Sequence, residues 1–174
     1  MELLDLMKRR HSIRKYTGGK ISTENLEKIL QAGMLSATGK NKKPWEFIVV
    51  RDKAALEQMS ASRAAGAQML AGADTAIVVI ADPEKTDTWV EDCSIVMANM
   101  HLMAHSLGIG SCWVQGRLRE AKDGRSTEDY LRSMLHYPEN YRLEATLSLG
   151  MPDERRAPAE TDKLPVEKIH WGQY

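Results

Sequence analysis

Residues 89–107 constrain the fold most, because a helix formed by them would be apolar on most of its circumference. Asn99, His101 and His105 interrupt the apolar run, so it does not form a bilayer span. Gly108 follows at the position where glycine commonly ends a helix. A helix that is apolar on all sides is buried on all sides, inside a core or between subunits. In a chain of 174 residues, enough for one domain, we expect it at a dimer interface.

Shorter patterns of apolar residues and caps predict the other elements. Apolar runs bounded by turn residues predict four strands, at residues 46–51, 75–81, 111–114 and 142–149. Helical spacing predicts helices at residues 2–8, 23–36, 53–60 and 127–135, with Ser22 or Thr23 and Ser126 or Thr127 as caps. Residues 61–73 are rich in alanine and glycine and fit either a helix or a mobile lid. The irregular alternation of strands and helices predicts an α/β or α+β fold.

Residues 150–174 are expected to form an extended arm. They hold three of the six prolines and show no clear periodicity. They nevertheless end in Val166, Ile169 and Trp171, whose apolar side chains need burial. An arm lying across a partner subunit would supply that burial. We therefore expect a single domain, residues 1–174, whose arm reaches a second copy of the chain.

A cluster of basic residues lies near the N-terminus and comprises Lys8, Arg9, Arg10, Arg14 and Lys15. Strand-like alternation would point Arg10, Ser12 and Arg14 to one side and His11 and Ile13 to the other. Two guanidinium groups and a hydroxyl directed at one point suit a phosphate, because arginine presents paired donors that match its oxygens. A solvated basic arm, or a weak nucleic-acid contact, is the alternative.

The overall charge and the cysteines exclude several classes of protein. Lys and Arg total 24 and Asp and Glu total 24, so the basic cluster is local, which argues against a nucleic-acid binder. Cys93 and Cys112 make no disulfide framework, and the N-terminus lacks the apolar region of a secretory signal. We expect a cytoplasmic protein without a membrane partner. His101 and His105 could share a metal ion, but no third ligand is evident, so we expect no metal site.

Five groups of residues occur in order along the chain: Arg10-His11-Ser12-Ile13-Arg14-Lys15-Tyr16, Lys42-Lys43-Pro44-Trp45-Glu46-Phe47-Ile48-Val49-Val50, Leu107-Gly108-Ile109-Gly110-Ser111-Cys112-Trp113, Leu149-Gly150-Met151-Pro152, and Lys163-Leu164-Pro165 with His170-Trp171. Together they resemble the FMN-dependent nitroreductase family over the whole chain. The resemblance implies an α+β fold with a central, mostly antiparallel sheet flanked by helices. It also implies an intertwined homodimer in which FMN lies at the subunit interface and the C-terminal arms are exchanged.

The resemblance also assigns cofactor-binding residues. The segment that holds the FMN phosphate and ribityl chain in the family is matched by Arg10, His11, Ser12 and Arg14. The loop that reaches the flavin from the other subunit is matched by Thr38, Gly39 and Asn41. The strand end whose amides face the flavin N5 edge is matched by Gln115 and Gly116. Lys163 stands where the family usually has an arginine at the phosphate, and Thr161 where some members have lysine. These two departures leave less positive charge around the phosphate. Asn41 as a simple turn residue and Gly116 as a strand terminator are the alternatives.

The function that the resemblance implies is an oxidoreductase in which NADH or NADPH reduces FMN and a flat, electron-poor acceptor then takes the electrons. Nitroaromatics, quinones and flavins are such acceptors. The nicotinamide and the acceptor would use the same flavin face in turn, in a ping-pong cycle. The cofactor carries the redox chemistry, so no catalytic side chain is nominated. One alternative is a specialised branch such as a reductive dehalogenase, although residues 61–73 lack the Glu, Tyr and Lys of its lid. Another is a flavin-binding or interaction protein without turnover.

Overall fold

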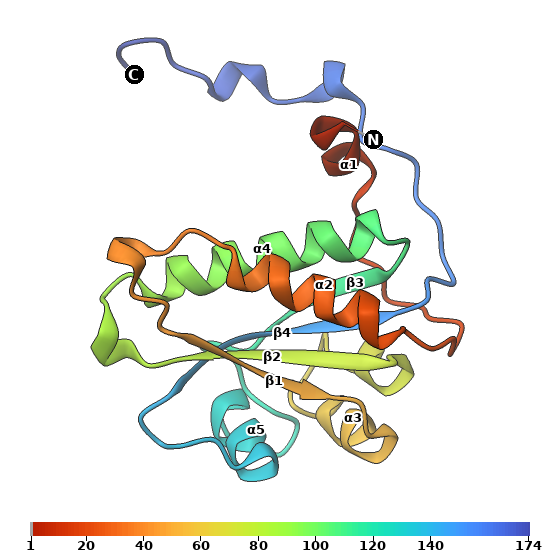
Figure 1. Cartoon of the computed structure of the whole chain (residues 1–174), viewed down its shortest axis with the longest axis vertical. Helices are drawn as coiled ribbons and strands as arrows, with labels where there is room; N and C mark the ends of the chain where they lie inside the picture. Colours follow the sequence, from red (N-terminus) through yellow and green to blue (C-terminus); the bar gives the residue numbers. More distant parts are fainter. Residues whose placement is uncertain (1) are drawn as a thin grey trace.

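The computed structural model describes residues 2–174 and has a central sheet of four antiparallel strands (Figure 1). The strands are β1 (Trp45–Val50), β2 (Thr75–Ala81), β3 (Gly110–Gln115) and β4 (Arg142–Gly150), in the spatial order β1-β2-β4-β3. The prediction of an α+β fold with a mostly antiparallel sheet is confirmed. β3 is an edge strand, and it is this edge that the N-terminal segment approaches.

Helices cover both faces of the sheet. α2 (Thr23–Met34) and α4 (Trp89–Ser106) lie on one face, and α3 (Lys53–Met59) and α5 (Thr127–Leu135) lie on the other (Figure 1). α1 (Leu3–Arg9) lies beyond α4, on the side away from the sheet. Short 3-10 turns are η1 (Gly39–Asn41), η2 (Gln68–Gly72), η3 (Pro83–Lys85), η4 (Thr161–Lys163) and η5 (Val166–Lys168). No helix within residues 2–174 is long and apolar enough to cross a membrane.

Side-chain caps fix where three of the helices begin. Ser22 accepts a hydrogen bond from the Asn25 amide at 3.2 Å, and Ser126 accepts one from the Asp129 amide at 2.9 Å. Asp52 caps α3 through the Ala55 amide at 2.8 Å. Each cap satisfies an amide that the first turn of a helix leaves without a partner. Of the two caps predicted for each of α2 and α5, the serine is therefore the one used.

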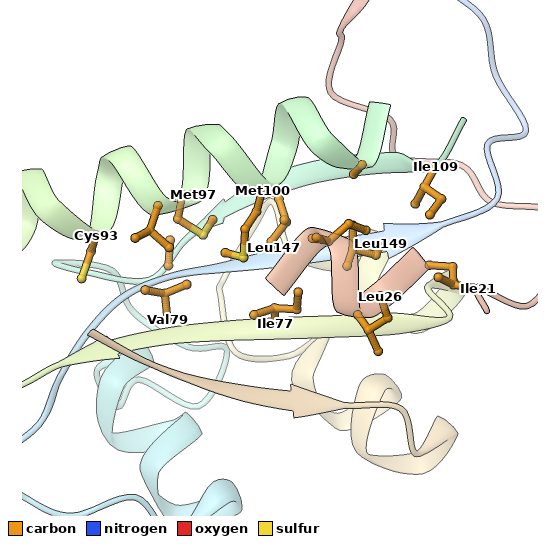
Figure 2. Packing of buried hydrophobic residues seen from close by; sticks show 14 of the residues in the cluster. Ile21, Leu26, Ile77, Val79, Cys93, Met97, Met100, Ile109, Leu147 and Leu149 are labelled. Carbon is orange, nitrogen blue, oxygen red and sulfur yellow. The ribbon is translucent and has the colours of Figure 1, made fainter. Parts of the chain in front are cut away.

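The core has two layers, separated by the sheet. Figure 2 shows Ile77 and Val79 of β2 facing Met97 and Met100 of α4. Alternate residues of β2, Val78 and Ile80, face α3 and α5 in the second layer, with Leu56 and Leu131 among their neighbours. All seven residues of β2 are buried, because both faces of the strand are covered. This double coverage explains why β2 is continuously apolar.

The structure adds detail in three regions where the sequence leaves conformation or burial open. Residues 61–73 form turns and η2 and are neither a regular helix nor a lid, because Ala67 and Leu70 are fully buried. α4 packs one side against the sheet and leaves Ile95 on its other side 40% exposed, so a single chain does not bury it all round. The expected arm of residues 150–174 has its first residue, Gly150, in β4 and contains only the short turns η4 and η5, and Trp171 on it is 90% exposed. Within one chain, the apolar side chains of the arm lack the burial that they need.

Candidate cofactor site

The basic N-terminal segment lies along β3, where it extends the edge of the sheet. Ser12 forms a parallel bridge with Ser111, and the Ile13 amide donates to the Ser111 carbonyl at 2.9 Å. Ile13 is buried against Gly110, where a Cβ atom would lie 2.7 Å from Ile13 Cγ2. The glycine therefore allows the segment to approach the strand closely. One buried apolar residue and one backbone bridge fix the direction of the polar side chains on either side of Ile13.

Arg10 and Ser12 share a cavity that His11 and Ile13 do not line, whereas Arg14, which alternation would place with Arg10 and Ser12, does not line it. Arg10 and Ser12 line one open cavity of about 460 Å³ together with Met7, Ala98, His101, Leu102 and Trp113. His11 and Ile13 line a different cavity, under the start of the C-terminal arm. Arg14 lies near Cys112: burial raises the pKa of that thiol, and the Arg14 charge partly offsets the rise. The structure thus brings Arg10 and Ser12 together and places His11 elsewhere.

Arg10 is held by a histidine and not by a carboxylate. Its Nη1 atom lies 2.9 Å from Nε2 of His101, the one side chain within residues 2–174 to which the guanidinium is hydrogen-bonded. The part of the chain that the structure describes contains no ion pair between Arg10 and an acidic side chain. A partly buried guanidinium without a counter-charge is costly, and an anion in the cavity would supply one.

The loop with Thr38, Gly39 and Asn41 lies at the beginning of α4, away from Arg10. The Gly39 amide donates to Asp92 Oδ1 at 2.9 Å. Asp92 precedes His101 by nine residues on α4, which is about 14 Å along the helix axis. Asn41 adopts a φ of 55°, a left-handed conformation that asparagine tolerates. One chain therefore does not bring this loop to Arg10 and Ser12.

Gln115 and Gly116 lie at the far end of β3 from Ser12. Gln115 Oε1 accepts a hydrogen bond from Trp113 Nε1 at 2.8 Å, which fixes the amide side chain. The Gly116 and Arg117 amides both donate to the Glu144 carbonyl, at 3.2 and 2.9 Å. The backbone amide of Gly116, which the resemblance directs at the flavin, is thus hydrogen-bonded within the chain. Gly116 lines a separate cavity of about 260 Å³.

Lys163 lies on the exposed arm and pairs with Glu160, with Nζ and Oε2 2.7 Å apart. Nearer its start, the arm is tied to the N-terminal segment: the Ala159 amide donates to the Lys8 carbonyl at 2.8 Å, and His11 Nε2 donates to the Ala157 carbonyl at 2.9 Å. Lys163 is not among the residues that line the cavity of Arg10 and Ser12. Within one chain, Lys163 therefore does not lie at the predicted phosphate site.

Sequence reasoning missed two residues of this region, His101 as the partner of Arg10 and Glu144. Glu144 is the extra residue of a β-bulge, because Val79 pairs with Ala145 while the next residue of β2 pairs with Leu143. The bulge turns the Glu144 side chain toward Ser94 of α4, whose hydroxyl lies 3.5 Å away. A single acidic residue inside the apolar run 143–149 was the available signal.

Glu144→Gln is expected to stabilise the protein by about 1 kcal/mol at pH 8, because Glu144 is buried and its Oε2 has no partner within residues 2–174. Burial raises the pKa of Glu144, so the folded chain keeps a proton that the unfolded chain loses as pH rises above the ordinary value of 4.5. The free energy of unfolding of the wild type therefore falls as pH rises from 4.5 toward the raised pKa of Glu144 in the folded chain. Urea unfolding at pH 4 and pH 8 measures the difference, with the exposed Glu139→Gln as the control. An equal gain at both pH values would contradict the prediction.

The two remaining candidates for other chemistry are not supported. Within residues 2–174, no three His, Cys, Asp or Glu side chains are grouped to hold a metal ion. Cys93 and Cys112 are buried and unpaired. Burial raises the pKa of both thiols, which keeps them protonated and unreactive at neutral pH.

The fold belongs to the class of α+β proteins with an antiparallel sheet flanked by helices, and a basic segment lies along its edge strand β3. Residues 7–151 match the model of the nitroreductase family. A solved FMN-dependent nitroreductase from Clostridium difficile R20291 is 40% identical, with a TM-score of 0.96 over 99% of this chain and 100% of that one. The chain belongs to the nitroreductase family.

Two further relatives agree with this assignment. A protein of Archaeoglobus fulgidus, provisionally named NADH dehydrogenase/NAD(P)H nitroreductase, is 42% identical over 174 residues, with 97% of each chain covered. A solved structure from Bacteroides thetaiotaomicron with the same provisional name is 34% identical and has a TM-score of 0.90, with 98% of this chain and 97% of that one covered. The likeness extends beyond the matched residues 7–151 into the C-terminal arm.

Proposed function

We propose that the protein is an FMN-dependent oxidoreductase that takes electrons from NADH or NADPH and reduces flat, electron-poor acceptors. The observation that carries this proposal is the cavity in which the Arg10 guanidinium, without an acidic partner among the described residues, lies with the Ser12 hydroxyl. The relatives named above support it, since their names give FMN and NAD(P)H. Nitroaromatics, quinones and flavins are the acceptor classes that fit.

The residues present suit FMN. Arg10, Ser12 and Arg14 would hold the phosphate at one end of β3, and Gln115 and Gly116 would adjoin the ring at the other end. Ser111, which bridges Ser12, and Gly116 are five residues apart, or about 16 Å along a strand. That length suits an elongated molecule with a phosphate at one end and a ring system at the other. FMN held there would supply the redox chemistry between NAD(P)H and the acceptor, in a ping-pong cycle.

We further propose that the working form is a homodimer, which would complete the site. Thr38, Gly39 and Asn41 lie at the opposite end of α4 from Arg10, so they reach the cofactor only from a second copy. The exposed arm would cross to that copy and bring Lys163 to its phosphate. We place the enzyme in the cytoplasm, where NAD(P)H is available and the unpaired Cys93 and Cys112 stay reduced.

The test is the colour of the purified protein and its response to reductant. Oxidised FMN absorbs in the blue, so the protein is expected to be yellow and to bleach anaerobically with NADH, NADPH or both. Reoxidation by a quinone or a nitroaromatic completes the cycle, and parallel-line kinetics would show the ping-pong order. A yellow protein that neither nucleotide bleaches would instead be a flavin-binding protein without turnover.

Lys163→Ala is expected to weaken FMN binding several-fold, and Lys163→Arg to hold FMN at least as tightly, because arginine presents a planar fork to a phosphate. The effect should be larger at low ionic strength, since exposed charges are screened by salt. The rate of bleaching of the bound flavin should hardly change, because the phosphate end positions the ring without taking part in hydride transfer. Stopped-flow reduction and FMN titration on the same variants separate the two. A variant that keeps FMN yet loses the reduction step would show that the arm passes the ring instead.

A further inference from the structure

We propose that His101 is a positioning residue for the FMN phosphate: its imidazole accepts a hydrogen bond from Arg10 and thereby fixes the guanidinium that faces the cavity. This inference rests on the proposed function, since the anion in question is the phosphate of FMN. His101 lies on α4, and neither the family match nor the motifs of the chain give it a role at the phosphate.

The geometry places His101 between two residues that come from different parts of the chain. The ring is only 8% exposed and lies on the face of α4 that looks toward β3. Its Nε2 atom lies 2.9 Å from Arg10 Nη1, and its Nδ1 atom is hydrogen-bonded to the Ser111 hydroxyl. Arg10, Ser12 and His101 line the same cavity. Both ring nitrogens are therefore engaged, and one of them holds the cationic group of the site.

The protonation of the ring follows from its partners. Arginine has no acceptor, so Nε2 must present its lone pair to Arg10 and the ring proton must sit on Nδ1. Nδ1–H then donates to the Ser111 oxygen. Burial, with the nearby charges of Arg10 and His105, lowers the pKa of His101 to about 4. The ring is consequently neutral at physiological pH, as an acceptor for a guanidinium has to be.

A neutral acceptor suits this position better than a carboxylate would. A carboxylate would pair with Arg10 and neutralise the charge that the phosphate needs. The imidazole commits one N–H of the guanidinium and leaves its charge, and its other donors, for the ligand. Holding the planar group in place before binding lowers the ordering cost that the ligand would otherwise meet.

Ser111 links this arrangement to the sheet. Its backbone forms the bridge with Ser12 and accepts the Ile13 amide, while its hydroxyl accepts from His101. One residue of β3 therefore sets the position of the Ser12 hydroxyl directly and that of the Arg10 guanidinium through the imidazole. The two phosphate-binding groups share a single reference point on the sheet.

The experiment compares two ligands and two substitutions at His101. Apo-protein of the full chain is titrated with FMN and with riboflavin, which lacks the phosphate. His101→Phe keeps a ring without an acceptor, and His101→Gln keeps an acceptor. We expect His101→Phe to weaken FMN roughly tenfold, the effect of losing a hydrogen bond to a charged group, and to leave riboflavin affinity unchanged. His101→Gln should recover most of the loss.

Two controls separate positioning from a general structural role. His105→Phe alters the half-buried histidine one turn later, which lines the other cavity, and should leave FMN affinity unchanged. In an Arg10→Ala background, His101→Phe should have no further effect on FMN, because the group that it positions is gone. Thermal unfolding confirms that each variant is folded. Should His101→Phe not fold, His101→Leu serves for the same comparison.

The outcomes distinguish this inference from the function on which it rests. Wild-type protein that binds neither flavin overturns the proposed function, and the inference with it. Wild-type protein that binds FMN, with His101→Phe equally tight, overturns the inference alone. Equal losses of FMN and riboflavin, or equal losses with and without Arg10, also overturn it, because the histidine would then act on the whole site.

Discussion

Arg10→Ala is expected to weaken FMN binding by about 1.5–3 kcal/mol, the usual contribution of hydrogen bonds to a charged group. This corresponds to a roughly ten- to hundredfold higher Kd. Arg10 lines the same cavity as Ser12, and among the described residues its guanidinium is hydrogen-bonded to neutral His101 and to no carboxylate. Its positive charge is therefore available to a ligand. Fluorescence titration of the apo-protein with FMN measures the loss.

The matched control is Arg9→Ala. Arg9 is the neighbouring arginine, but it lines the other cavity with His11 and Ile13, so its removal should change the Kd for FMN by less than about twofold. Arg14→Ala should weaken binding in the same direction as Arg10→Ala. Unchanged FMN affinity in both Arg10→Ala and Arg14→Ala would show that the basic cluster is a solvated arm and not a phosphate site. Equal losses for Arg9 and Arg10 would show a diffuse electrostatic effect in place of a shaped site.

The fold could be predicted closely where short stretches of sequence decide it. β2 and α5 begin and end at the predicted residues, because a doubly covered strand is continuously apolar and a serine cap marks the start of the helix. Residues 61–73 could not be predicted in this way. Their alanines and glycines carry little local preference, and the position of the segment is set by contacts such as the hydrogen bond from the Ala64 amide to the Glu120 carbonyl.

The site shows the same division between local and distant information. Alternation along residues 10–14 separates Arg10 and Ser12 from His11, because the period of an extended chain is local, but it does not bring Arg14 into their cavity. The pairing of Arg10 with His101 joins residues 91 positions apart and left no trace in the spacing of either motif. The roles predicted for Asn41 and Lys163 depend on a second chain, and they stay predictions.

Ile95→Asp is expected to dissociate the proposed dimer and to release FMN. Ile95 lies on the side of α4 that faces away from the sheet and is 40% exposed in one chain. An apolar residue there is explained if a second copy covers it, as are the exposed side chains Val166, Ile169 and Trp171 of the arm. In a twofold dimer the substitution occurs twice at the same interface, so dimerisation would remove two carboxylates from solvent.

Burying an unpaired carboxylate costs several kcal/mol. A dimer with a nanomolar dissociation constant should therefore dissociate into monomers at micromolar protein concentration. Sedimentation equilibrium gives the mass, and absorbance of the same samples gives the flavin content. Val49→Asp is the control, since Val49 is a partly exposed apolar residue on β1, at the opposite edge of the sheet from β3. It should stay dimeric and yellow. FMN should be lost together with the dimer. The loop with Thr38, Gly39 and Asn41 is bonded to Asp92, which is about 14 Å along α4 from His101 at the Arg10 site, so in the proposed dimer the loop reaches the flavin of the partner. A stable monomer that keeps its FMN would contradict both the interface on α4 and the sharing of the flavin between two chains.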